Sequence, residues 1–264
     1  MNNIIKNHPN EPDPLAISLQ SSDSFTETSV LHRELMDKNH SDIFLEYMLP
    51  FLRMHHIKLN KLEELKARIK LLKISNIPLT SSPYPRNPNT RKGNFAEIFL
   101  AEYLKSTTDK KLPVYRLRYN PNKEESMKGD DVLLFDLDSN PVRIIVGEAK
   151  YRKTPSKKAV IEIVENLIRS NKLFIPMSLT FVADRLYDEG NKELSEKVYN
   201  CSYLFSSDKL KIDYVGLLMS NMNANKHINR HTTNELHNLL MISLGMINPE
   251  LIIEKAFNQL EAEL

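Results

Sequence analysis

Residues 129–153 read GDDVLLFDLDSNPVRIIVGEAKYRK, and this stretch decides the fold of the chain. Two largely apolar runs, 132–137 and 142–152, flank the sequence DSNP at 138–141. Asp, Ser, Asn and Pro are turn-forming residues, and short apolar runs bounded by turn signals are typical of buried strands. The stretch therefore predicts an antiparallel hairpin with its strands inside the protein.

Charged side chains stand at one end of this predicted hairpin. Asp130 and Asp131 precede the first strand, while Glu148 and Lys150 come late in the second, about as far from the turn. Residues two apart in a strand share a face, so Glu148 and Lys150 point the same way and Ala149 points to the opposite side. We expect the acids and the lysine to meet at one edge of the sheet.

This grouping is suited to a divalent cation, because carboxylate and carbonyl oxygens are the ligands that Mg²⁺ and Mn²⁺ prefer. We expect Asp131, Glu148 and the backbone carbonyl of Ala149 to hold the ion, with Asp130 as the second choice. Such an ion lowers the pKa of a bound water and neutralises charge on a phosphate. Lys150 is expected to orient that water or to stabilise the developing charge.

The chain around the hairpin predicts an α/β protein with a mixed sheet. Upstream we expect a helix over 94–104, with Glu97 as a third carboxylate, and a strand over 114–119. Downstream we expect a helix over 156–171 and a strand over 177–183. The predicted order of this core is α-β-β-β-α-β.

Composition divides the chain into three parts. Residues 1–28 are polar and predict a flexible N-terminal arm, and 29–92 predict a helical region that ends in a Pro-rich linker. The third part, 93–264, contains the sheet. Outside the core, the remaining expected elements are helices over 41–56 and 60–74, a helix near 190–200, a strand near 210–219, and helices over 231–245 and 249–263.

The overall composition excludes several classes of protein. The chain has 264 residues and a net charge of +2, which excludes a generally polybasic nucleic-acid binder. A single cysteine, Cys201, excludes a disulfide scaffold and predicts a cytoplasmic protein. No apolar run reaches the ~18 residues of a spanning helix, and the N-terminus does not resemble a signal peptide, so we expect no membrane association.

Positive charge is nevertheless concentrated locally. Residues 142–172 contain eight Lys and Arg against three Glu. Beside a metal site, such a cluster is suited to binding a phosphate backbone without reading bases. We expect Arg152, Lys153, Lys157 and Lys158 to contact DNA, and a solvated helix face remains the alternative explanation.

The motifs together resemble the PD-(D/E)XK nuclease superfamily. GDD at 129–131 precedes an apolar strand, E-A-K at 148–150 follows after sixteen intervening residues, and an earlier helix contains Glu97. The resemblance extends over 94–183 and implies a restriction-endonuclease-like core with helical N- and C-terminal additions. It also implies a Mg²⁺-dependent deoxyribonuclease, with the nuclease domain in 93–264.

The superfamily's functional residues map onto this sequence one by one. Its metal-binding acid maps onto Asp131, its E-x-K onto Glu148 and Lys150, and its helix acid onto Glu97. Asp130 stands where the motif has proline, which leaves the metal ligands intact.

A narrower resemblance is to the HamA family, the nuclease subunits of the Hachiman anti-phage system. It rests on the chain size and on KGNFAEIFLAEYL at 92–104, GDDVLLF at 129–135 and GEAKYRK at 147–153. In that family the nuclease pairs with a superfamily-2 helicase, HamB, which restrains it until phage replication disturbs DNA. The resemblance implies an effector that degrades DNA with little sequence preference, in complex with a HamB-like helicase.

Two other functions remain open at this point. One is a stand-alone restriction or repair nuclease of the same superfamily, which a neighbouring methyltransferase gene would favour over a neighbouring helicase gene. The other is a non-catalytic DNA-binding adaptor, which an absence of Mg²⁺ and Mn²⁺ binding would favour. An ordinary salt-bridged sheet edge would explain the E-x-K pattern without any function.

Overall fold

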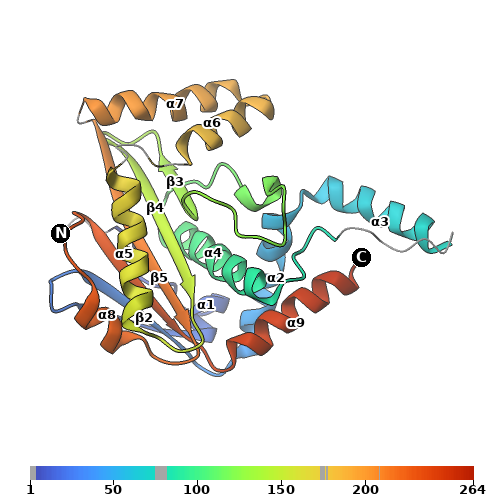
Figure 1. Ribbon diagram of the computed structural model, residues 1–264, viewed down its shortest axis with the longest axis horizontal. Coiled ribbons are helices and arrows are strands. Elements are labelled where there is room, and N and C mark those ends of the chain that lie inside the picture. Colours follow the sequence, from blue (N-terminus) through green and yellow to red (C-terminus); the bar gives the residue numbers. More distant parts are fainter. Residues whose placement is uncertain (1–3, 75–81, 173–175, 177, 208) are drawn as a thin grey trace.

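Figure 1 shows a computed structural model of the chain, which describes residues 4–74, 82–172, 176, 178–207 and 209–264. The elements of these residues follow one another as α1 (Pro14–Ser18), β1 (Leu19–Phe25), β2 (Leu31–Asp37), α2 (Ser41–His56), α3 (Leu59–Ile74), α4 (Pro88–Ser106), the 3₁₀ helix η1 (Arg116–Tyr119), β3 (Val132–Asp136), β4 (Val142–Tyr151), α5 (Lys157–Lys172), α6 (Leu179–Asp188), α7 (Lys192–Ser206), β5 (Leu210–Ser220), α8 (Asn225–His231), β6 (Leu239–Gly245) and α9 (Pro249–Ala262).

The strands of the described residues form one six-stranded sheet in the order β1-β2-β6-β5-β4-β3. The four inner strands, β2, β6, β5 and β4, run parallel. β1 and β3 pair antiparallel with their neighbours at the two edges. The predicted α/β class with a mixed sheet is therefore confirmed.

Helices cover both faces of this sheet (Figure 1). The hydrophobic core on one face includes side chains from α1, α2, α4 and α9. The core on the other face includes side chains from α5, α6, α7 and α8. Helix α3 projects from the body of the protein, and the α6–α7 pair lies at one end of the sheet. No helix in the described part of the chain is both long enough and apolar enough to cross a bilayer.

The hairpin predicted around the DSNP turn is present. β3 and β4 pair antiparallel, with Val132 opposite Gly147. Continuing this register by one residue brings Asp131, the residue before β3, beside Glu148 of β4. The helix expected over 94–104 lies within α4, so the three elements that were expected to supply acids are neighbours in the fold.

Gly147 allows α4 to pack closely against β4. A Cβ atom at this position would lie 2.9 Å from Cβ of Val132 and 3.1 Å from Cδ2 of Leu100. Leu100 lies about one helical turn after Glu97 on α4. The absence of a side chain at Gly147 therefore also sets how near Glu97 lies to the end of the hairpin.

The prediction of a flexible arm over 1–28 is wrong for the described residues of that segment. β1 pairs with β2 along its length, and Ile4, Ile5 and Leu15 are buried in the core. The strand LQSSDSF is polar because an edge strand exposes most of its side chains, so it lacks the apolar pattern of a central strand.

The region 29–92 is also not wholly helical. It contains β2, which lies between β1 and β6 in the sheet, together with the two helices expected over 41–56 and 60–74. α4 begins at Pro88, inside the expected Pro-rich linker, because the Asn87 side chain caps it and proline suits the first turn of a helix. Linker residues 75–81 lie outside the described residues.

Three further elements differ in type from the prediction. The expected strand over 114–119 ends in η1, and the expected strand over 177–183 is largely part of α6, with Met177 outside the described residues. The expected helix over 231–245 contains β6, so the terminal regions add strands as well as helices. The order α-β-β-β-α-β is therefore wrong. All seven residues of β6 are buried, and a short apolar run does not by itself distinguish a buried strand from a helix.

Two buried histidines are held in the neutral form. Nδ1 of His56 donates to the carbonyl oxygen of Leu52 at 2.7 Å, and Nε2 accepts from the Asn94 amide at 3.1 Å. Burial lowers the pKa of His56 to about 4. Burial likewise lowers the pKa of His32 to about 4.

We expect the protein to lose stability as the pH falls from about 6.5 to about 4. In this range the two histidines bind a proton in the unfolded chain but stay neutral in the folded one. The free energy of unfolding should fall by up to about 1.4 kcal/mol per pH unit for each histidine. Urea unfolding of His56→Phe, which keeps an aromatic ring beside Tyr84 and Phe257, should show a shallower decline. The same decline in both proteins would contradict the prediction.

Replacing Gly147 by Ala should lower the free energy of unfolding by about 1–3 kcal/mol, because the new methyl group crowds Val132 and Leu100. The matched control is Gly93→Ala on α4, where an added Cβ meets nothing within 4 Å. Alanine favours a helix over glycine by about 1 kcal/mol, so the control should be at least as stable as the parent protein. If thermal unfolding shows that the two variants are equally stable, Gly147 is not a packing constraint.

Candidate functional site

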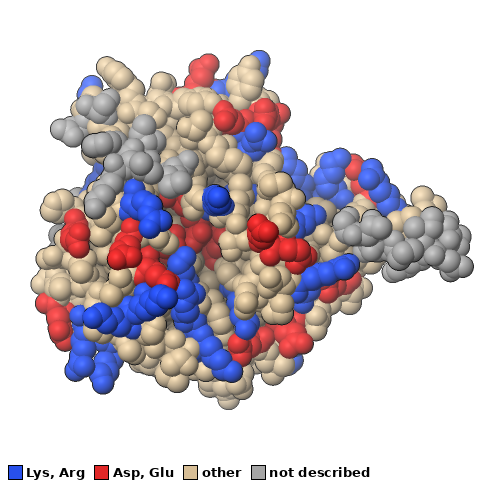
Figure 2. Space-filling model, viewed as in Figure 1, with Lys and Arg blue, Asp and Glu red and all other residues tan. Residues whose placement is uncertain are grey.

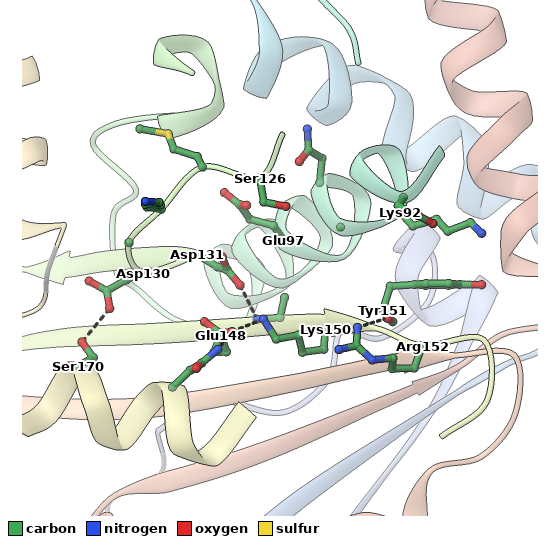
Figure 3. A pocket seen from close by; sticks show the side chains of 18 of the residues that line it. Lys92, Glu97, Ser126, Asp130, Asp131, Glu148, Lys150, Tyr151, Arg152 and Ser170 are labelled. Atoms are coloured by element: carbon green, nitrogen blue, oxygen red, sulfur yellow. Dashed lines mark hydrogen bonds and ion pairs between the residues drawn. The ribbon is translucent and has the colours of Figure 1, made fainter. Parts of the chain in front are cut away.

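A cavity of about 580 Å³ opens where β4 ends, between α4 and α5. Its walls are the first half of α4, the loop 126–131, the end of β4 and the second half of α5. Figure 2 shows acidic side chains inside this hollow and basic side chains around it. Figure 3 shows the residues that line it.

Three carboxylates reach the floor of this cavity from three different elements. Glu97 comes from α4, Asp131 from the residue before β3, and Glu148 from β4 (Figure 3). Glu97 and Glu148 are buried, and the Asp131 side chain is 18% exposed. The structure thus brings together the acids that the sequence expected to meet.

The side chain of Asp131 extends the pairing of β3 with β4. Its Oδ2 accepts a hydrogen bond from the amide of Ala149 at 2.9 Å, just beyond the last backbone pair of the hairpin. This bond fixes Asp131 across the end of β4. The Asp131 contact at Ala149 is therefore through the amide, and the role of the Ala149 carbonyl remains a prediction.

Lys150 lies beside the carboxylate of Glu148, as the two-residue period of a strand predicts. Nζ of Lys150 lies 2.6 Å from Oε1 of Glu148, and Nδ2 of Asn166 on α5 donates to the same oxygen at 2.6 Å. Burial acts to lower the pKa of Lys150, but the charge and hydrogen bond of Glu148 outweigh it, so the pKa lies above its ordinary value. Lys150 is therefore a cation and a hydrogen-bond donor at neutral pH.

Arg116 of η1 is a member of this site that the sequence did not reveal. Its Nε lies 3.4 Å from Oε1 of Glu97, and its Nη1 lies 3.9 Å from Oδ1 of Asp131. The same guanidinium donates to the carbonyl oxygens of Met127, at 2.6 Å, and of Asp130. Because arginine stays charged and has a rigid fork of donors, it links the loop before β3 to the floor acids.

The floor acids lie beside two cations, Arg116 and Lys150. Burial, followed by the charge of Glu148, raises the pKa of Asp131 above its ordinary value. Burial also raises the pKa of Glu97, and the charges of Asp131 and Glu148 add to this while Arg116 opposes it. The folded chain therefore holds protons on these carboxyl groups near neutral pH, and a bound divalent cation would displace the protons and stabilise the ionised forms.

Asp130 points away from this floor, toward α5 (Figure 3). Its Oδ1 accepts from Oγ of Ser170 at 2.7 Å, and its Oδ2 accepts from the amide of Ser178 at 2.9 Å. Gly129, with a φ of 110°, makes the turn that allows this, and a Cβ there would lie 2.7 Å from Oγ of Ser178. The geometry favours Asp131 over Asp130 as a metal ligand.

The donor set fits an open magnesium site rather than a closed cage. Within the described ranges, no three His, Cys, Asp or Glu side chains are grouped closely enough to ligate one ion together. Mg²⁺ is commonly held by one or two carboxylates and keeps several waters. Asp131 and Glu148 meet that requirement, because they reach the same cavity from neighbouring strands.

Cations line the mouth of the cavity. Lys92, Lys128, Arg152 and Arg169 all contribute to its lining, in addition to Lys150. Of the four residues expected to contact DNA, Arg152 belongs to this lining. The other three lie outside the lining and are exposed: Lys153, Lys157 and Lys158.

Comparison with known proteins places the chain in a family. A profile of the HamA family matches residues 15–260. The chain is 34% identical to the Hachiman protein HamA of Bacillus cereus over 250 aligned residues. The aligned region covers 93% of this chain and 90% of that protein. The chain belongs to the HamA family. This confirms the narrower resemblance drawn from the sequence, and membership of the PD-(D/E)XK superfamily remains a prediction.

The HamA match includes every residue that lines the cavity, from Asn89 to Ser170. One sequence signal could have revealed more of it. Glu162, Asn166 and Ser170 recur every four residues and form a polar stripe on the helix that follows β4. Arg116 had no such signal, because its position in an alternating stretch favoured a strand.

In this HamA-family protein, Arg116→Gln should lower the free energy of unfolding by about 3 kcal/mol, because two buried carbonyls lose their donor and the floor acids lose a cation. Arg116→Lys should be intermediate, since an ammonium keeps the charge without the fork. We would measure both by urea unfolding.

The same substitution should cost less in a Glu97→Gln background, where one of the repelling charges is gone. Equal costs in the two backgrounds would show that Arg116 and Glu97 are not coupled.

Proposed function

We propose that this HamA-family chain is a metal-dependent deoxyribonuclease that acts in anti-phage defence. The observation that supports this most strongly is the convergence of Glu97, Asp131, Glu148 and Lys150 in one cavity with a basic mouth. Neither fold stability nor surface solvation requires three partly uncompensated acids in one place, since their repulsion is destabilising. Metal-assisted phosphodiester hydrolysis uses such a group to hold the metal ion.

Asp131 and Glu148 would hold the Mg²⁺ or Mn²⁺ ion, with the Ala149 carbonyl as the proposed third ligand. The ion supplies an activated water and neutralises charge on the phosphate when it is bound. Lys150, as a protonated donor, would hold a phosphate oxygen or the water in position. Asn166 fixes the Glu148 carboxylate from the α5 side, and Glu97 would support the hydration shell.

The substrate that this site suits best is the DNA backbone. Lys and Arg at the cavity mouth bind phosphates, and phosphate contacts position a nucleic acid without reading its sequence. We therefore propose cleavage with little sequence preference.

We also propose that the chain works in the cytoplasm with a helicase partner. The similar protein from Bacillus cereus is named a Hachiman protein, and the family resemblance implies a superfamily-2 helicase of the HamB kind. Such a motor would supply the DNA that the nuclease site receives.

Glu148→Gln and Lys150→Ala should each reduce Mg²⁺-dependent cleavage of plasmid DNA by at least about 100-fold, because they remove a metal ligand and a charge-stabilising donor. The assay uses the purified chain with and without its helicase, in Mg²⁺ or in EDTA. Calorimetry should show that Glu148→Gln loses Mn²⁺ binding while Lys150→Ala keeps it. The matched control is Glu165→Gln, at an exposed acid on α5, which should cut like the parent protein.

Undiminished cutting by the Glu148→Gln, Lys150→Ala double variant would refute the nuclease assignment. Cutting at defined sequences without any helicase would favour a stand-alone restriction enzyme. Tight DNA binding without any uptake of Mg²⁺ or Mn²⁺ would favour a non-catalytic adaptor.

A further inference from the structure

Two basic residues directly after β4 are each paired with an acid from another element. Nη2 of Arg152 lies 2.5 Å from Oε2 of Glu162 on α5. Nζ of Lys153 lies 3.4 Å from Oε2 of Glu250, in the first turn of α9. These are two of the residues that the sequence singled out as contacts for DNA, and in the free chain their charges are partly neutralised.

Each of these acids also holds a second cation. Oε1 of Glu250 lies 2.6 Å from Nζ of Lys92 on α4, which also lines the cavity. Oε1 of Glu162 lies 3.9 Å from Nζ of Lys158 on α5. Each carboxylate therefore sits between two cations next to the catalytic cavity.

The Glu250 group is built from three separate parts of the chain. Lys92 comes from α4, Lys153 from the segment after β4, and Glu250 from α9. The hydrogen bond from Lys92 holds the pKa of Glu250 below its ordinary value, so this acid is ionised at neutral pH. Nζ of Lys92 also lies 5.6 Å from the centre of the Tyr151 ring, which keeps the ammonium at the cavity mouth.

A carboxylate between two cations resembles a backbone phosphate in charge and in its oxygen acceptors. The Arg152 and Lys153 side chains are 42% and 68% exposed, so an incoming strand can reach them. Ion pairs with this much exposure are weak. A polyanion that gains several contacts at once can therefore displace the internal acids.

We propose that Lys92 with Lys153, and Arg152 with Lys158, form two phosphate-binding subsites that Glu250 and Glu162 occupy in the free chain. The inference rests on the proposed function, since the ligand is the phosphate backbone of the nuclease substrate. DNA that reaches the floor acids displaces both glutamates. The free chain consequently binds DNA less tightly than its basic residues would otherwise allow.

The test is DNA binding in EDTA, where cleavage does not interfere. Fluorescence anisotropy with a labelled oligonucleotide compares the parent chain with a Glu162→Gln, Glu250→Gln double variant. The matched control is Glu165→Gln, Glu254→Gln, which changes the same net charge on the same two helices at exposed acids.

The first double variant should bind DNA about tenfold more tightly, because the two carboxylates that compete with DNA through four weak ion pairs are removed. Its affinity should also fall more steeply with salt, by a slope of roughly 0.9 for each additional phosphate neutralised. The control should remain within about twofold of the parent, since within the described residues neither Glu165 nor Glu254 forms an ion pair with these four cations, and exposed charges interact weakly through solvent. Adding Lys153→Gln to Glu250→Gln should remove the gain at that subsite.

If both double variants gain DNA affinity by the same factor, the inference is overturned and the nuclease proposal still stands. A gain that survives Lys153→Gln would overturn the Glu250 subsite in the same way. If no protein, the parent included, binds DNA with or without its helicase, the proposed function fails and the subsites fail with it.

Discussion

The antiparallel pairing of β3 with β4 is the constraint on which the rest of the site depends. It places Val132 opposite Gly147, and so brings Asp131 beside Glu148. The missing side chain at Gly147 then lets α4 pack against the hairpin, which brings Glu97 to the same place. One register and one close contact thus determine the positions of three acids that are far apart in the sequence.

Bringing these acids together has an electrostatic cost that the surrounding structure reduces. Arg116 neutralises part of the charge and connects the floor to the carbonyls of the loop before β3. Lys150 and Asn166 share one oxygen of Glu148, while Asp130 is withdrawn to Ser170. Burial raises the pKa of Glu97 and of Asp131, and a bound divalent cation would stabilise their ionised forms.

The mouth of the cavity depends on parts of the chain that come last in the sequence. α9 supplies Glu250, which contacts both α4 and the segment after β4. β6 lies between β2 and β5 and connects the N-terminal strands to the strands beneath the cavity. The N-terminal and C-terminal regions are therefore parts of the sheet and of the site rather than separate additions.

Local sequence determined the hairpin, the α4 and α5 helices, and the shared face of Glu148 and Lys150, because turn chemistry and the two-residue period act over a few neighbours. The elements expected over 177–183 and 231–245 were misassigned, since the short apolar runs within them fit a buried strand or a buried helix equally well. Arg116 and Glu250, the acid that pairs with Lys153, were decided by the tertiary structure alone. Their partners lie tens of residues or more away in most cases, and no local period in a sequence records which distant charges will meet.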